Sequence, residues 1–69
     1  MKISARNVLS GKVVSIVRGP VTTEVTLEIA PGVQIVSTIT SNSADSLKLG
    51  EGQAAYAVIK ASSVMVGTD

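Results

Sequence analysis

The sequence predicts an all-β domain, a small and partly open barrel of about five strands with one short helical turn. Two patterns support this fold class. Residues 12–17 (KVVSIV) and 33–40 (VQIVSTIT) are rich in β-branched side chains, which favour strands. Residues 24–29 (EVTLEI) alternate strictly between polar and apolar side chains, as a half-buried strand does. With 69 residues, the chain is expected to form a single domain spanning residues 1–69.

The first two predicted strands are separated by a turn signal. The first covers residues 12–17 and ends before the pair Gly19–Pro20, a combination typical of turns. The second covers residues 24–29, and its two faces differ in character. Val25, Leu27 and Ile29 lie on the face expected to be buried, while Glu24, Thr26 and Glu28 lie on the face expected to meet solvent.

A hairpin and a short helical turn follow. Pro31 presets φ and Gly32 can adopt positive φ, so this pair predicts a tight turn into a return strand over residues 33–40. The next segment breaks the β pattern. Asn42 or Ser43 is expected to cap a helix of one or two turns, with Asp45 in its first turn.

The C-terminal part returns to strand. Gly50 and Gly52 are expected to end the helix, and residues 54–61 (AAYAVIKA) form the next predicted strand. Its small side chains favour close packing against another layer or another subunit. Ser62 and Ser63 are expected to bend the chain before a last short strand at residues 64–66. This order of elements is typical of an open barrel of the OB type.

So small a domain has few ways to become stable. It contains no cysteine and no histidine, which excludes disulfides and the common zinc sites built from these residues. Oligomerisation is the remaining route for a chain of this size. An open barrel also leaves edge strands that must be covered. The segment over residues 2–7 is a candidate for pairing with a neighbouring subunit.

Composition argues against several functional classes. The net charge is +1 and Tyr56 is the single aromatic residue, whereas a nucleic-acid surface needs clustered basic and aromatic side chains. No run of 18 apolar residues and no signal peptide is visible, so a cytoplasmic protein without a membrane span is expected. Without histidine, cysteine or paired catalytic carboxylates, an enzyme is not expected, nor is a metal-cation site or a cofactor.

Hydrogen-bond donors, in contrast, are plentiful where the predicted elements end. Ser4 and Arg6 precede the first strand, and Thr40 and Ser43 lie at the entry to the helix. Lys60 lies at the end of the last long strand, and Ser62 is two residues further on. Guanidinium, ammonium and hydroxyl groups are the donors that an anion requires. These residues are therefore candidates for an oxyanion site.

Four segments carry a family resemblance: ISARN, LSGKVVSI, TITSNSADSLKLGEGQ and YAVIKASSVMV. Together they resemble the molbindins, the small Mop proteins, whose domain is also called TOBE. The resemblance covers essentially the whole chain and implies an OB-like barrel. It also implies that the protein binds molybdate, and tungstate as well, for cytoplasmic storage or homeostasis. The implied assembly is a homo-oligomer, a hexamer built as a trimer of dimers, with ligands held between subunits.

The resemblance also implies which residues bind the anion. They are Ser4, Ala5, Arg6, Thr40, Ser43, Lys60, Ala61 and Ser62. Ala5 and Ala61 are expected to contribute backbone N–H groups. Some relatives carry serine after the lysine, so the contact of that hydroxyl is lost at Ala61, and Ser62 is a weak substitute. Arg6 is expected to come from one subunit and Lys60 from another.

Two other interpretations remain open at this point. The first is an OB-like module that binds nucleic acid, which filter binding with single-stranded DNA would reveal. The second is a purely structural oligomer, in which serine and threonine serve only to form strands. Calorimetric titration with molybdate separates this second interpretation from an anion-binding protein.

Overall fold

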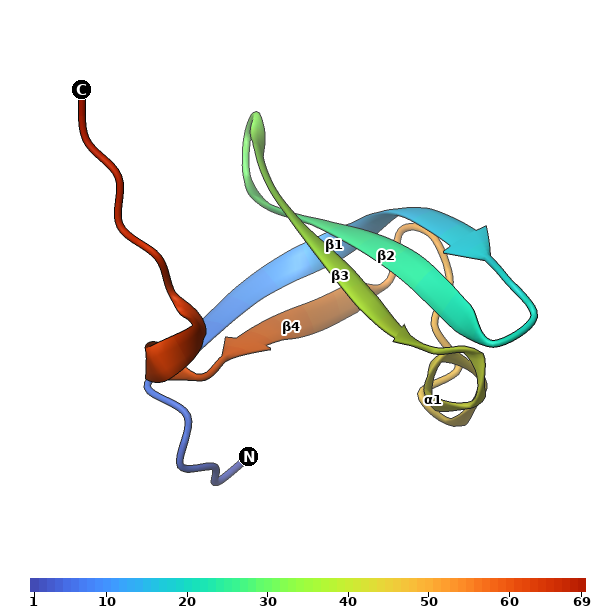
Figure 1. Ribbon diagram of the computed structural model, residues 1–69. Coiled ribbons are helices and arrows are strands. Elements are labelled where there is room, and N and C mark those ends of the chain that lie inside the picture. The colour runs from blue at the N-terminus through green and yellow to red at the C-terminus, as the bar shows by residue number, and fades with distance from the viewer.

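The computed structural model describes residues 1–69 and contains one curled antiparallel sheet with strand order β3-β2-β1-β4 (Figure 1). The elements are β1 (Asn7–Arg18), β2 (Thr22–Ala30), β3 (Val33–Thr40), α1 (Ser41–Ser46), β4 (Ala54–Ile59) and a single turn of 3₁₀ helix, η1 (Ala61–Ser63). The predicted all-β class, the open barrel and the single short helix are confirmed. With six residues, α1 is far too short to cross a membrane.

The sheet curls because the long strand β1 has two partners. Its N-terminal half pairs with β4, from Asn7 opposite Ile59 onwards, and its C-terminal half pairs with β2, ending with Arg18 opposite Thr23. The register shifts after Val13 in β1, and such bulges bend a strand and increase its twist. The result is a half-barrel whose edge strands, β3 and β4, remain unpaired on one side.

Gly11 lies where β1 changes partner, and a Cβ atom there would come within 2.8 Å of the carbonyl oxygen of Glu28. We expect Gly11→Ala to lower the free energy of unfolding by about 1–3 kcal/mol, because the backbone of β2 must move to admit a methyl group. Gly50→Ala is the matched control, since nothing lies within 4 Å of its Cβ position. Urea unfolding compares the two variants, and equal stability would contradict the close approach at Gly11.

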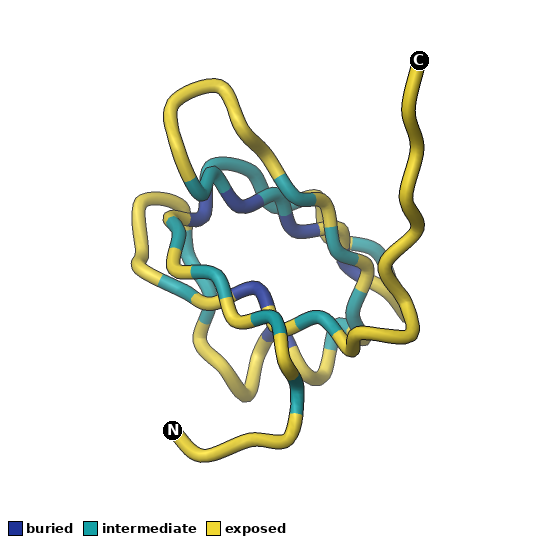
Figure 2. Tube along the Cα trace, turned by 90° about the vertical axis from the view of Figure 1, so that its left-hand side faces the viewer, coloured by how far each residue is buried: buried dark blue, intermediate teal, exposed yellow.

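The core is small and lies inside the curl of the sheet. Its buried members are Val13, Val25, Leu27 and Ala57, and the half-buried side chains around them are Leu9, Ile16, Ile35, Ile39, Leu49 and Ala55. Only 6 of the 69 residues are buried, and the buried positions face one another across the ring of strands (Figure 2). The predicted alternation holds for the first part of β2, where Val25 and Leu27 are buried and Glu24 is exposed. It fades at Glu28 and Ile29, which are both half-buried where the register against β3 shifts.

The predicted fifth strand is absent. Residues 64–66 follow η1 as an unpaired segment, and the C-terminus projects away from the sheet (Figure 1). Met65 is 95% exposed and Val66 is 90% exposed. The pattern of apolar side chains was sufficient to predict a strand, but a strand also needs a neighbouring edge, and none lies beside this segment in its own chain.

Strand boundaries differ from the prediction. β1 begins at Asn7 rather than at residue 12, because β4 provides a partner for the additional residues. β4 ends at Ile59 rather than at residue 61, because the chain turns into η1, where the Ser63 N–H donates to the Lys60 carbonyl (2.8 Å).

The predicted helix also starts and ends earlier than expected. Its N-cap is Thr40, not Asn42 or Ser43, because the Thr40 hydroxyl accepts the Ser43 N–H. Asp45 consequently lies beyond the first turn. The helix ends at Ser46, before either of the glycines that were expected to terminate it.

Candidate anion-binding site

Six of the predicted site residues line one open hollow of about 560 Å³. They are Ser4, Ala5 and Arg6 from the N-terminal segment and Lys60, Ala61 and Ser62 from the chain after β4. Ile3 and Val58 complete the lining as apolar walls. We call this feature the cationic hollow.

The pairing of β1 with β4 brings the two segments together. Asn7 is opposite Ile59 in the last pair of the ladder, so the next residues outward are Arg6 and Lys60. Beyond this pair η1 folds the chain back, which brings Ala61 and Ser62 to the same hollow. Residues far apart in sequence therefore meet because one antiparallel ladder ends there.

Both charged side chains that line the cationic hollow are positive. Arg6 and Lys60 are exposed, and the one ion pair of the chain, between Arg18 and Asp45, involves neither. No carboxylate lines the hollow. Like charges opposite one another on neighbouring strands repel and destabilise the pair. An anion in the hollow would relieve this repulsion, and the hydroxyls of Ser4 and Ser62 can donate further hydrogen bonds to it.

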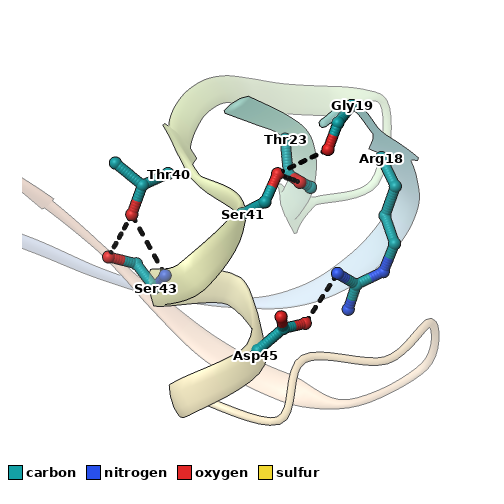
Figure 3. A network of polar contacts seen from close by, with 7 residues as sticks. All are labelled: Arg18, Gly19, Thr23, Thr40, Ser41, Ser43 and Asp45. Carbon is teal, nitrogen blue, oxygen red and sulfur yellow. Dashed lines mark hydrogen bonds and ion pairs between the residues drawn. The ribbon is translucent and has the colours of Figure 1, made fainter. Parts of the chain in front are cut away.

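The remaining two predicted residues, Thr40 and Ser43, lie at the start of α1. The Thr40 hydroxyl donates to Ser43 Oγ (2.7 Å) and accepts the Ser43 backbone N–H (3.0 Å), as Figure 3 shows. Both side chains are exposed. The Thr40 hydroxyl uses its proton in the hydrogen bond to Ser43 Oγ. The Ser43 hydroxyl accepts that bond and keeps its own proton for a ligand.

A network of polar contacts fixes the start of α1 to the turn between β1 and β2 (Figure 3). The Ser41 hydroxyl donates to the Gly19 carbonyl (2.7 Å) and also hydrogen-bonds the buried Thr23 hydroxyl (2.8 Å). Arg18 and Asp45 form an ion pair at 2.7 Å beside it. The position of the Thr40 and Ser43 hydroxyls is thus defined relative to the C-terminal end of β1.

The two groups of site residues lie at opposite ends of β1. The cationic hollow is next to Asn7, whereas Thr40 pairs with Thr22, beside the Arg18 end. At about 3.3 Å per residue, the strand separates them by on the order of 30 Å along its length. A small anion cannot contact both groups in one chain. Arg6 and Lys60 line the same hollow of one chain.

A second concave feature runs between the two unpaired edge strands. This open groove has a volume of about 670 Å³, and 14 of its 16 lining residues are hydrophobic. Ile35 and Ile39 from β3, Ala55 and Ala57 from β4 and Leu49 from the connecting loop are among them. The groove is the missing side of the barrel, and in the single chain it is open to solvent.

Sequence reasoning did not assign Ile3, Val58 or Asn7 to the anion site, and it expected Asn7 to pair with a neighbouring subunit, whereas Asn7 pairs with Ile59 of its own chain. The side chain of Asn7 donates from Nδ2 to the Ile59 carbonyl (3.3 Å). Only the register of β1 against β4 shows that Asn7 borders the cationic hollow, since residues 7 and 59 are 52 positions apart. The one signal in the sequence was the motif SARN, in which Asn7 directly follows the predicted site residue Arg6.

The chain is similar in sequence to proteins named for molybdenum. Residues 3–66 match the family model described as the TOBE domain. A probable molybdenum-pterin-binding protein of Haemophilus influenzae is 51% identical over 69 residues, which is all of both chains. The molybdenum transport protein ModE of Herbaspirillum seropedicae is 49% identical over the same length. The chain spans 26% of ModE. These names describe binding and transport of molybdenum rather than catalysis.

Solved structures are similar over nearly the whole chain. MopII from Clostridium pasteurianum, in an apo form, matches 97% of this chain and 100% of its own, with a TM-score of 0.91 and 48% identity. A molybdate-binding protein from Sporomusa ovata has the same TM-score at 35% identity, covering 99% of this chain and all of its own. The cytoplasmic molybdate-binding protein ModG, with molybdate bound, has a TM-score of 0.84 at 44% identity, covering 88% of this chain and 43% of its own.

Proposed function

The chain belongs to the TOBE-domain family, among its Mop-like members, and from this premise we propose that it binds molybdate in the cationic hollow. Molybdate is a tetrahedral dianion whose oxygens only accept hydrogen bonds at neutral pH. The observation that carries the proposal is that Arg6 and Lys60 face one hollow and have no acidic partner. Their two charges balance those of the anion, and charge-assisted hydrogen bonds are the stronger kind.

The remaining oxygens are bound by neutral donors. Ser4 and Ser62 offer hydroxyls from the two sides of the cationic hollow, and Ala5 and Ala61 offer backbone N–H groups. Tungstate carries the same charge and is nearly the same size, so the same donors bind it as well. No lining residue is acidic, which favours a fully deprotonated anion over one that must donate a proton.

The site is completed by a second copy of the chain. Thr40 and Ser43 lie at the end of β1 far from the cationic hollow of their own chain, so they can contact only an anion held by another copy. Each ligand then lies between subunits, with the hollow of one and the α1 hydroxyls of the other around it. This division replaces the one first expected, in which Arg6 and Lys60 came from different chains.

Exposed apolar surface supports assembly of the chain with itself. The open groove between β3 and β4 lacks one strand, and residues 64–66 are an apolar segment that has no strand partner. The segment projects away from the sheet of its own chain (Figure 1) and does not line the groove. We propose that it enters the groove of a second copy, because burial of apolar surface favours such an arrangement. The proposed assembly is a hexamer, a trimer of dimers.

The physiological role that fits this site is storage and homeostasis of the oxyanion in the cytoplasm. A site made of two cations, hydroxyls and backbone amides binds an anion but offers no group poised for proton transfer or nucleophilic attack. ModG, which has 44% sequence identity in the matched region, is described as a cytoplasmic molybdate-binding protein. Storage requires reversible binding alone.

Calorimetric titration of the chain with molybdate tests the proposed function. We expect saturable binding, with tungstate replacing molybdate and single-stranded DNA giving no heat of binding. The melting temperature should rise with molybdate, since a ligand at a hundred times its dissociation constant stabilises the state that binds it by about 2.7 kcal/mol per site. Absence of saturable binding for both oxyanions would refute the proposal and leave a purely structural oligomer.

Selectivity among oxyanions gives a further prediction. Phosphate at pH 7 carries a proton that needs an acceptor, and the cationic hollow is dominated by donors, so phosphate should compete poorly with molybdate. Sulfate has no proton but is smaller, and should bind more weakly through longer contacts. Competition calorimetry against preloaded molybdate measures both. Displacement of molybdate by an equimolar amount of phosphate would contradict this assignment of donors.

A further inference from the structure

Asn7 lies at the junction between the sheet and the cationic hollow. It is the first residue of β1, and its partner Ile59 is the last residue of β4. Besides this backbone pairing, its side chain donates from Nδ2 to the Ile59 carbonyl (3.3 Å) and is partly buried. The residue after Ile59 is Lys60, and the residue before Asn7 is Arg6. One side-chain hydrogen bond therefore clamps the backbone immediately next to both cations.

Two effects tend to separate β1 and β4 at this end of the ladder. Arg6 and Lys60 are the next residues beyond the last pair and line one hollow, and two like charges held near each other oppose the approach of the two segments. Strand ends also fray more easily than strand centres. A side-chain bond on the last pair opposes both tendencies, and it does so without adding a negative charge, which would compete with an anionic ligand.

We propose that Asn7 is a positioning residue for the anion site, which holds Arg6 and Lys60 at the spacing that binds the anion. The inference rests on the proposed function of the cationic hollow. Asn7 is absent from the lining of the hollow and acts through the two cations. When the binding-competent arrangement is only partly populated, apparent affinity falls by the same fraction. Loss of the Asn7 bond should therefore weaken binding, although every donor to the anion remains.

The test compares molybdate affinity and stability in matched variants of the whole chain. Asn7→Ala removes the clamp, and Asn7→Leu removes it while keeping the size of the side chain. Thr68→Ala is the control, because it removes another side-chain–backbone bond, from the Thr68 hydroxyl to the Asp69 carbonyl (3.0 Å), outside both the cationic hollow and the open groove. A net hydrogen bond corresponds to roughly a three- to tenfold change in an equilibrium constant.

We expect both Asn7 variants to bind molybdate about three- to tenfold more weakly, and Thr68→Ala to bind as the unmodified chain does. In a Lys60→Ala background the effect of Asn7→Ala should shrink to less than about twofold, because residues that act through one another are not additive.

Three results would overturn the inference while leaving the proposed function intact. They are unchanged affinity in Asn7→Ala, unmodified affinity in Asn7→Leu, and an equally large effect in the Lys60→Ala background. The second would mean that packing, not the hydrogen bond, is responsible. Failure of the unmodified chain to bind molybdate would instead refute the proposed function, and the inference with it.

Discussion

Arg6→Ala and Lys60→Ala should each weaken molybdate binding about ten- to a hundredfold while the protein stays folded. Removal of one partner of a charge-assisted hydrogen bond costs roughly 1.5–3 kcal/mol, which gives this range of affinity. The loss should be large because the cationic hollow has no other positive side chain. Calorimetry measures it, with Lys12→Ala as the control, since Lys12 is an exposed cation of β1 outside the hollow.

The same two variants should be no less stable than the unmodified chain when no ligand is present. Arg6 and Lys60 make no ion pair, and removal of either one relieves the repulsion between them. Urea unfolding without ligand should therefore separate binding from folding. Unmodified affinity in both variants would contradict the site, and a large loss of stability in both would show that the residues serve the fold instead.

Removal of residues 64–69 should convert the assembly into monomers and abolish tight binding, although all eight proposed site residues remain. Met65 and Val66 are 95% and 90% exposed in the single chain and Val64 is 48% exposed, so nearly all of the surface of the first two and about half of the third is free to be buried elsewhere. Full burial of such a side chain is worth roughly 1.5–3 kcal/mol, so loss of three of them weakens association by several orders of magnitude.

Sedimentation at a series of concentrations measures this second effect. A chain that lacks only residues 67–69 is the matched control, because it keeps the apolar segment and should still assemble. In the proposed assembly the site spans two copies, so the monomeric variant should also lose the contribution of the Thr40 and Ser43 hydroxyls. An unchanged assembly in the variant that ends at residue 63 would mean that another surface joins the subunits.

Local pattern was sufficient to predict most of the fold. The alternation in residues 24–29 gave the buried face of β2 correctly, and the pair Pro31–Gly32 marked the β2–β3 turn, where Gly32 has a φ of +76°. Each of these signals is carried by residues close together in the chain. Strand ends were less predictable, because β1 extends to Asn7 only where β4 offers a partner.

The segment over residues 64–66 shows where local pattern fails. Its side chains suit a strand, yet whether it pairs depends on an edge that its own chain does not place beside it. The helix cap was predicted at the wrong residue for a related reason. Several neighbouring residues can cap a helix, and the hydrogen bond from Ser41 to Gly19 helps to hold the start of α1 at one of them.

The candidate site was predictable in its residue types but not in its arrangement. Hydroxyl and cationic residues at the ends of elements indicated an anion site. Which of them meet depends on strand register. Arg6 and Lys60 line one hollow because Asn7 pairs with Ile59, and Thr40 lies at the other end of β1 because it pairs with Thr22. Pairings between distant segments leave no signature in a single sequence.

Complementation between two defective chains tests most directly whether the anion is held between subunits. One chain carries Arg6→Ala with Lys60→Ala, and the other carries Thr40→Val with Ser43→Ala. Each alone should bind molybdate weakly, through the loss of the cations in the first and of the hydroxyls in the second. Mixed assemblies, isolated through a different tag on each chain, then contain complete sites in which the second chain supplies the hollow and the first supplies the α1 hydroxyls. We expect calorimetry on the mixed assemblies to show a class of sites with the affinity of the unmodified protein. Binding in the mixture no tighter than in either parent would contradict a site shared between subunits.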